Sequence, residues 1–296
     1  FRKFNEYELA KYNRDDKVKL RDVLFLAHAK PKDEAQAALW KRLVDGQLAT
    51  PDTWEVLLSG GADKKEAFVR LMAEKKLGAL AFLRNLRNMH EAGVQKGAVA
   101  EYASSLKVER VLPFRFITAA RIVPQWEDVL EPLMMTCLAE QEKLPGRTVL
   151  LLDVSGSMNE RLSAKAETTR LDAGLGLGVL LREICAEAEI FTFSNAVVQV
   201  APRRGFALRD AMKTSQPHSG TYLAQAVQAL NAKVEYDRII VVTDEQTHDG
   251  IVTPKAKGYV INVGTYKNGV GYGKWLHIDG WSEAVIDYIR AFEVAA

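Results

Sequence analysis

The chain has 296 residues, enough for one large or two ordinary domains, and 48% of them are hydrophobic, enough to fill their cores. Its formal net charge is only +2, so the overall charge favours no class of partner. The two cysteines, Cys137 and Cys185, exclude a disulfide-stapled fold and favour a reducing cytoplasmic compartment. Without a signal peptide or an apolar run near the roughly 18 residues that span a bilayer, no membrane partner is expected.

Short amphipathic helices are predicted through the first half of the chain. In residues 19–28, apolar side chains fall at the i, i+3, i+4 and i+7 positions of one helical face. Comparable faces, separated by breaks, recur in residues 35–44, 54–58, 67–72, 77–86, 99–106, 114–123 and 129–139. The series predicts an α-solenoid of helix pairs. An irregular helical bundle is the alternative, because no sharp sequence repeat accompanies the pattern.

The periodicity changes after residues 140–147, whose Pro145-Gly146 pair indicates a junction between domains 1–144 and 145–296. Beyond the junction, apolar strand-like runs alternate with helix-like runs, which predicts a doubly wound, mostly parallel sheet with helices on both faces. The predicted fold class is an α-solenoid followed by a Rossmann-like α/β domain. The strand-like runs are 149–152, 190–193, 197–200, 239–242, 259–263 and 275–278, and the helix-like runs are 170–186, 221–232 and 282–292.

Oxygen-bearing side chains gather where two of the predicted strands end. The first strand leads into a D-x-S-x-S loop, the second ends in Thr-Asp, and a further threonine opens the helical run before it. In open α/β sheets, sites lie beyond the carboxyl ends of the strands, and hard oxygen ligands suit Mg²⁺, Mn²⁺ or Ca²⁺ better than zinc. A metal-free, hydrogen-bonded loop cluster is the alternative. The predicted ligands of a divalent cation, with Mg²⁺ preferred, are Asp153, Ser155, Ser157, Thr221 and Asp244.

Positive charge is concentrated in residues 64–121, which carry twelve Lys or Arg against five Glu, whereas residues 122–145 carry five acidic residues and one Lys. A helical surface with this excess is typical of phosphate binding, with ordinary solvated helix faces as the alternative. Arg84 and Arg87 are three residues apart and share a helical face. Their planar guanidinium groups match phosphate, and the neighbouring Asn85 and Asn88 can bond bases or sugars.

Five segments together resemble the TROVE-domain family, the Ro ribonucleoproteins: LRDVLFLAHAKP (20–31), LAFLRNLRNM (80–89), VLPFRFITA (111–119), LLDVSGSM (151–158) and VVTDEQT (241–247). The five oxygen ligands also resemble the metal-ion-dependent adhesion site (MIDAS) of von Willebrand factor A (VWFA) domains, D-x-S-x-S then T then D. The resemblance to the TROVE-domain family implies a ring of HEAT-like repeats closed by an A domain. It further implies binding of small noncoding Y RNAs on the outer helical surface, and passage of single-stranded 3′ ends of misfolded RNAs through the central hole.

Carried over to this chain, the resemblance implies RNA binding by the basic helices. Two departures leave Y RNA binding itself open: the helical pairs that normally precede the Phe4 region are not found, and Ser59-Gly60-Gly61-Ala62 replaces residues that tend to be polar and basic. The candidate RNA-binding residues are Lys64, Lys65, Lys75, Lys76, Arg84, Arg87, Arg110, Arg115 and Arg121.

We therefore expect a non-enzymatic, cytoplasmic RNA-binding protein with noncoding RNA, Y-like or misfolded, as its partner and an RNA-processing protein as a further candidate. The alternative is a protein-interaction module that docks an acidic partner residue through the metal. An enzyme is not expected. Aspartyl-phosphate chemistry usually needs a second Asp two residues after the nucleophilic Asp, and Ser155 occupies that position after Asp153. No arrangement of Ser, His and Asp that indicates a catalytic triad can be identified in the sequence. Gly174, Gly176 and Gly178 fall inside a helical run, which indicates close helix packing and not a dinucleotide loop.

Overall fold

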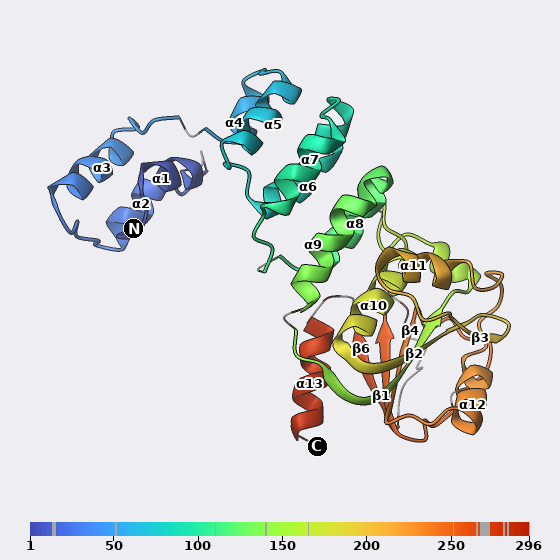
Figure 1. Cartoon of the computed structure of the whole chain (residues 1–296). Helices are drawn as coiled ribbons and strands as arrows, with labels where there is room; N and C mark the ends of the chain where they lie inside the picture. Colours follow the sequence, from blue (N-terminus) through green and yellow to red (C-terminus); the bar gives the residue numbers. More distant parts are fainter. Residues whose placement is uncertain are drawn as a thin grey trace. The chain divides into compact units, whose positions relative to one another are not determined.

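The computed structural model describes residues 1–13, 16–50, 52–109, 111–139, 141–164, 166–250, 252–264, 266, 273–280, 282 and 284–295. Its contacts divide the chain into two compact units, Phe1–Tyr102 and Ala103–Ala296. The first is helical and the second combines helices with a sheet (Figure 1). Among the described residues, no helix is long and apolar enough to cross a membrane.

The first unit is a succession of short helices, each begun by local side-chain chemistry. Asn5 and Glu8 form a capping box, and Asp33 and Asp63 each accept a hydrogen bond from the backbone three residues on. The helices are α1 Glu6–Tyr12, α2 Leu20–Leu26, α3 Glu34–Val44, α4 Trp54–Ser59, α5 Lys64–Ala73, α6 Ala79–Glu91 and α7 Lys96–Ser104, of which the sequence analysis missed α1.

Neighbouring helices pack through their apolar faces. Helices α1, α2 and α3 share a buried cluster of Leu9, Leu24, Trp40 and Leu43. Helix α4 contacts α5, α5 contacts α6, and the ring of Phe82 on α6 lies 5.9 Å from that of Tyr102 on α7. Burying each such side chain contributes about 1.5–3 kcal/mol, so the stability of this unit comes mainly from contacts between successive helices.

The second unit opens with two helices and continues as a six-stranded sheet. Several of its elements differ from the sequence prediction, and strands β1 and β2 begin about five residues earlier than predicted. The helix predicted to reach residue 186 ends at Ile184 because Cys185 is already extended and begins the next strand, and α11 was missed. The elements are α8 Phe114–Ile122, η1 Pro124–Trp126, α9 Glu127–Ala139, β1 Leu144–Asp153, η2 Gly156–Asn159, α10 Arg170–Ile184, β2 Cys185–Phe193, β3 Val197–Gln199, α11 Gly205–Lys213, α12 Leu223–Lys233, β4 Arg238–Thr243, β5 Lys257–Asn262, β6 Trp275–Asp279 and α13 Ala284–Ala295.

The strand order is β3-β2-β1-β4-β5-β6, and all neighbours are parallel except β2 and β3. The predicted mostly parallel, doubly wound sheet is confirmed. Leu151 and Val241 pack with Leu223 and Val227 of α12 on one face. Alternate residues point to the other face, where Leu152 approaches α10. The order reverses between β1 and β4, so the carboxyl ends of these strands form the topological switch point at which α/β sheets bind ligands.

The glycines of α10 allow close packing, as the sequence analysis predicted. A Cβ atom on Gly176 would lie 3.0 Å from Phe114 Cε2 and 3.2 Å from Ile117 Cγ2 of α8, and one on Gly178 would lie 3.3 Å from Leu152 Cδ1. Helix α8 can therefore approach the backbone of α10 directly.

The division into compact units comes earlier than the predicted domain boundary. The change from helices to alternating strands and helices falls at Leu144, where β1 begins, close to the predicted division between 1–144 and 145–296. Helices α8 and α9 nevertheless belong to the second unit, because both contact α10 and α9 also contacts α11. The residue 144 boundary marks a change of secondary structure, whereas the packing changes after Tyr102.

Candidate metal centre and cationic helical surface

Two predicted ligands lie at the ends of adjacent parallel strands. Strand β1 ends at Asp153, and β4 ends at Thr243, immediately before Asp244. The register pairs Leu152 with Val242, which sets Asp153 beside Thr243. The Thr243 hydroxyl donates to Asp153 Oδ2 at 2.6 Å, so the two strand ends are directly bonded.

The loop after β1 adds the two serines. The backbone N–H of Ser155 donates to Asp153 Oδ1 at 2.8 Å, and the Ser155 and Ser157 hydroxyl oxygens are 3.2 Å apart. Ser157 in turn donates to Asp244 Oδ1 at 3.2 Å. Asp153, Ser155 and Asp244 are at most 1% exposed, whereas Ser157 is half-buried. Hydrogen bonds thus link four of the five predicted ligands, and Ser157 gives the cluster its contact with solvent.

Thr221 reaches this region through its loop. Gly156 donates its backbone N–H to the carbonyl of Ser219 at 2.9 Å, which holds the Thr221 loop against the serine loop. The Thr221 backbone N–H donates to His248 Nδ1 at 3.1 Å, and the side chain is buried. Among the hydrogen bonds of the described residues, none joins the Thr221 hydroxyl to the other four ligands. Thr221 is therefore a neighbour of the cluster and not a member of its hydrogen-bond chain.

The two carboxylates of the site, Asp153 and Asp244, differ in whether a cationic side chain pairs with them. Burial raises the pKa of Asp153 to about 6, although hydrogen bonds from Ser155 and Thr243 oppose the shift. Asp244 has a cationic partner, Arg170, whose Nη1 lies 2.8 Å from Asp244 Oδ2. Within the described part of the chain, no cation pairs with Asp153 in the same way. A buried carboxylate without a counter-charge is costly, which is the electrostatic setting that a bound cation relieves.

The donor set suits a hard cation. Every side chain in it binds through oxygen, as Mg²⁺, Mn²⁺ and Ca²⁺ prefer, and no sulfur or imidazole ligand that would favour zinc is included. The described residues contain no group of three or more His, Cys, Asp or Glu able to hold a metal, so any such site depends on the serine and threonine hydroxyls.

Sequence reasoning missed two residues beside this cluster. Arg170, at the first position of α10, is only 6% exposed. Glu245 directly follows Asp244, is 1% exposed, has a left-handed φ of 63° and contacts His277 of β6. A left-handed non-glycine residue costs about 1–3 kcal/mol and is typical of functional sites. A charged first residue ahead of the small and apolar run 173–181 of α10 was the available signal for Arg170, whereas no local pattern marked Glu245.

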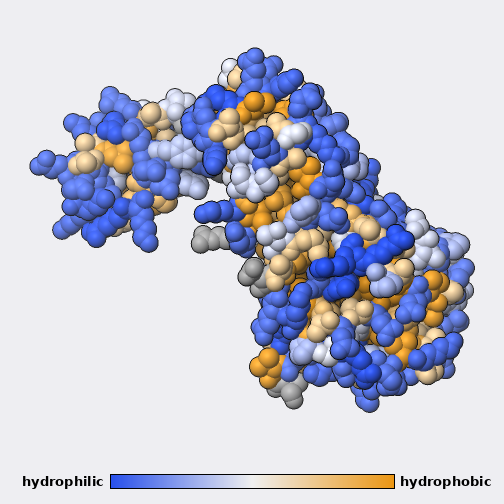
Figure 2. All heavy atoms as spheres, viewed as in Figure 1, coloured by the Kyte–Doolittle hydropathy of each residue, from blue (hydrophilic) through white to orange (hydrophobic). Residues whose placement is uncertain are grey.

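The candidate RNA-binding residues of the first unit lie at three places. Lys64 and Lys65 begin α5, Lys75 and Lys76 follow its end, and all four are exposed. Arg84 and Arg87 are exposed on α6, on the shared face that their spacing predicts. Figure 2 shows hydrophilic residues over much of the visible surface of this unit, interrupted by apolar patches.

Several predicted contacts are already engaged within the protein. Lys76 Nζ lies 2.7 Å from carboxylate oxygens of Asp52 and Glu74. Asn85 is 1% exposed and donates to the Ala81 carbonyl at 2.8 Å, so the expectation that it contacts bases or sugars is wrong. The apolar face of α6 buries it, because it lies between Phe82 and Met89 in the helical repeat.

In the second unit, Arg115 is exposed on α8. Arg121 is bonded to Asp172 and donates to the Glu167 carbonyl at 2.6 Å. Arg110 lies outside the described residues.

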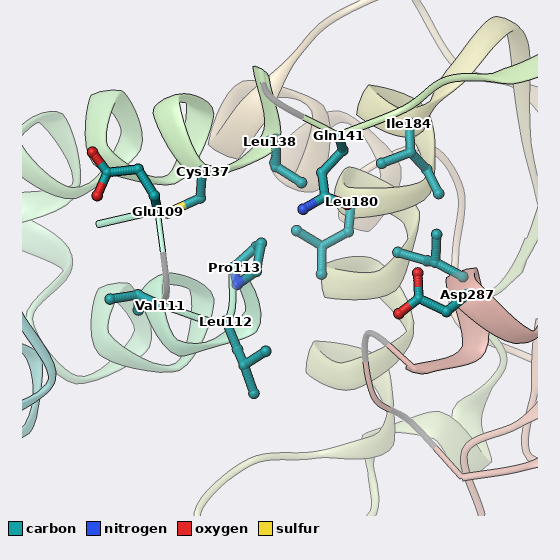
Figure 3. Close-up of a pocket in the computed structure, with 11 residues that line it drawn as sticks. Glu109, Val111, Leu112, Pro113, Cys137, Leu138, Gln141, Leu180, Ile184 and Asp287 are labelled. Carbon is teal, nitrogen blue, oxygen red and sulfur yellow. The ribbon is translucent and has the colours of Figure 1, made fainter. Parts of the chain in front are cut away.

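A cavity of about 230 Å³ opens elsewhere in the second unit, between the segment that precedes α8 and helices α9, α10 and α13. Its walls are mainly apolar, and Figure 3 shows Glu109 and Asp287 on opposite sides with Pro113 and Leu180 between them. Both charged lining residues are carboxylates, which repel phosphate. The cavity is therefore not a candidate site for the RNA backbone.

Comparison with known proteins identifies the family. The model of the TROVE domain matches residues 39–214, more than half of the chain. The chain belongs to the TROVE domain family. The match spans α5 and α6 with their exposed cations, and the D-x-S-x-S loop after β1. It ends before Thr221 and Asp244. A search of curated proteins found no match.

Among solved structures, this TROVE protein is similar to the crystal structure of the Deinococcus radiodurans Ro (RSR) protein. The TM-score is 0.61 at 23% sequence identity, and the alignment covers 98% of this chain and 74% of that one. At this identity the likeness establishes the fold, a helical repeat followed by an α/β domain. A Bacteroides fragilis aerotolerance-related membrane protein bearing multiple mutations to serine matches with a TM-score of 0.33 and 16% identity, over 40% of this chain and 67% of that one, too weakly to carry an argument.

Proposed function

We propose that this TROVE protein is an RNA-binding protein of the Ro ribonucleoprotein type, which acts by binding and not by catalysis. The observation that carries the proposal is the TROVE domain match over residues 39–214. The excess of positive charge in residues 64–121 and the exposure of Arg84 and Arg87 support it independently. The RNA we propose is a noncoding RNA, either Y-like or misfolded with a single-stranded 3′ end.

The exposed cations bind RNA through its phosphates. Arg84 and Arg87 offer planar forks for phosphate oxygens, and Lys64, Lys65 and Lys75 add point charges. Lys76 contributes less, because an approaching phosphate must compete with Asp52 and Glu74. Recognition of this kind reads shape and charge more than sequence, and it weakens steeply as salt rises.

We further propose that a divalent cation, with Mg²⁺ preferred, is held by Asp153, Ser155, Ser157, Thr221 and Asp244. The cation would offer a Lewis-acidic position to a carboxylate or phosphate oxygen of a partner. Asp153 and Asp244 supply the negative charge. The Ser157 hydroxyl donates to Asp244 and lies in hydrogen-bond contact with the Ser155 hydroxyl, and Thr243 fixes Asp153. Both cysteines are buried free thiols, which supports a reducing cytoplasmic compartment.

A second candidate function is the docking of an acidic residue from a protein partner, such as an RNA-processing enzyme, at this cation. The observation that favours it is the half-buried Ser157, which opens an otherwise buried cluster to the surface. The two functions use different parts of the chain and are compatible with each other.

A filter-binding titration tests RNA binding. A structured RNA and the same RNA with a single-stranded 3′ tail are titrated with the protein at 50 and at 200 mM salt. We expect binding at the lower salt and a fall in affinity of about tenfold or more at the higher, as counterion release predicts for several phosphate contacts. The absence of binding at 50 mM salt would contradict the proposal.

The variant Asp153→Asn separates the two functions, since it removes a charge from the proposed cation site and nearly preserves the shape of the side chain. RNA affinity should be unchanged if the helices carry RNA binding. Capture of a protein partner in the presence of Mg²⁺ should be lost if the partner docks at the cation. Loss of RNA affinity in this variant would indicate that the A domain, and not the helical surface, binds RNA.

A further inference from the structure

Arg170 is a buried cation in direct contact with the proposed metal ligands. Its Nη1 lies 2.8 Å from Asp244 Oδ2 and donates to the Ser157 carbonyl at 3.4 Å. Its side chain is 7% exposed and that of Asp244 is 0% exposed, so water screens the pair little. The predicted ligand set in the sequence included no cationic side chain, so this pairing appears only in the folded protein.

The two carboxylate oxygens of Asp244 face different side chains. Oδ1 accepts from the Ser157 hydroxyl and, at 3.3 Å, from the backbone N–H of Gln246, whereas Oδ2 accepts from the Arg170 guanidinium and, at 3.3 Å, from the side-chain amide of Gln246. A divalent cation bound near Asp244 would lie within a few ångströms of a fixed positive charge, and the two cations would compete for one carboxylate. Close charge pairs in poorly screened sites are coupled strongly enough to alter a binding constant.

The guanidinium has a second set of contacts that does not involve the proposed ligands. Nη2 lies 2.7 Å from Glu160 Oε2, and the guanidinium carbon stands 4.8 Å from the ring centre of Tyr266. The Glu160 side chain is 57% exposed, at the surface end of the contact. Arg170 can therefore keep a carboxylate and an aromatic partner when its hold on Asp244 weakens.

We propose that Arg170 is an internal counter-cation that competes with a divalent metal for Asp244 and thereby sets the cation affinity of the site. Glu160 and Tyr266 hold the guanidinium when the metal is bound. The inference rests on the proposed cation site and adds a residue that regulates it. The site then passes between an arginine-paired form and a metal-loaded form, and the local cation concentration decides between them.

Mn²⁺ binding to the full chain, measured by isothermal titration calorimetry, tests the proposal with three variants. Arg170→Met removes the competing charge, and we expect it to tighten Mn²⁺ binding by about tenfold or more, which corresponds to about 1.4 kcal/mol. Glu160→Gln removes the alternative partner, so Arg170 stays on Asp244 and Mn²⁺ affinity falls. Arg161→Met is the matched control, because it removes an exposed positive charge beside Glu160, and its affinity should stay within about twofold of wild type.

Thermal unfolding keeps the test valid if Arg170→Met is unstable. A ligand that binds only the folded state stabilises it by RT ln(1 + [L]/Kd), so at a fixed ligand concentration tighter binding raises the melting temperature further. Mn²⁺ should therefore raise the melting temperature of Arg170→Met more than that of wild type, and should partly restore its stability. Equal or weaker binding by Arg170→Met, with clear binding by wild type, would overturn the role of Arg170 and leave the cation site intact. Binding by neither protein would overturn both the site and its regulation.

Discussion

The polar cluster at the ends of β1 and β4 and the cations of α5 and α6 differ in how each charge is surrounded. Asp153 and Asp244 are buried, and each is held by specific atoms at short distances. Arg84 and Arg87 stand exposed on one helical face. In the buried cluster, a single contact between charged groups contributes a large free energy. On an exposed surface, binding to RNA would be the sum of many weak contacts. One substitution should therefore disable the cluster, but several are needed to disable the surface.

The largest effect is expected from Asp244→Ala. This variant leaves the buried guanidinium of Arg170 without its buried partner, and removing one member of a buried pair costs roughly 3–5 kcal/mol. Urea unfolding followed by tryptophan fluorescence measures the loss. Asp287→Ala is the control, because its side chain is 78% exposed, and it should change the free energy of unfolding by less than about 0.5 kcal/mol. Similar losses in the two variants would remove the distinction between buried and exposed charge.

An intermediate effect, on binding and not on stability, is expected from Arg84→Gln combined with Arg87→Gln. The logarithm of the RNA affinity falls linearly with the logarithm of the salt concentration, and the steepness of this line is the salt slope. For single-stranded RNA each lost phosphate contact lowers the magnitude of the salt slope by about 0.7, so the two substitutions should lower it by about 1.4. The free energy of unfolding should change by less than about 0.5 kcal/mol.

The matched control for this double variant is Arg21→Gln with Lys32→Gln, two exposed cations outside residues 64–121. Its salt slope should equal that of wild type. An equal fall in the control would mean that RNA responds to net charge alone and not to the face of α6.

The smallest effect is expected at Asp52. Hydrogen bonds from Arg70 and Lys76 hold the pKa of this carboxyl well below its usual range. Because the folded pKa lies below the unfolded value of about 3.9, the contribution to stability is present above that pH and is lost as the pH falls. Asp52→Asn should therefore lower the melting temperature slightly at pH 7, and the difference from wild type should shrink toward pH 3. A difference that is the same at both pH values would contradict the assignment.

Most of the fold could be predicted from local patterns. Strands β1 and β4 contain the continuous, buried apolar runs 149–152 and 239–242, and the helices carry apolar residues at helical spacing. The grouping of Asp153, Ser155, Ser157 and Asp244 also followed from sequence, because parallel strands bring their carboxyl ends to one edge. Their role as metal ligands and the role of the cations in RNA binding stay predictions.

Other features depend on residues distant in the chain. Arg170 and Asp244 are 74 residues apart, so no local pattern could pair them. Asn85 is polar, yet the packing of α6 buries it. The domain boundary predicted from secondary structure falls at residue 144, because the contacts of α8 and α9 with α10 cannot be seen in either helix alone.

Local patterns in the sequence indicated most of the helices and strands, the polar residues at two strand ends and the concentration of cations in residues 64–121, because hydrophobic periodicity and charge are local properties of the chain. They did not indicate α1 or α11. The packing of the folded chain establishes which carboxylate has a cationic partner, which lysine is already engaged and where the compact units divide. These depend on burial and distance between remote residues, which change the energy of a charge far more than its neighbours in sequence do.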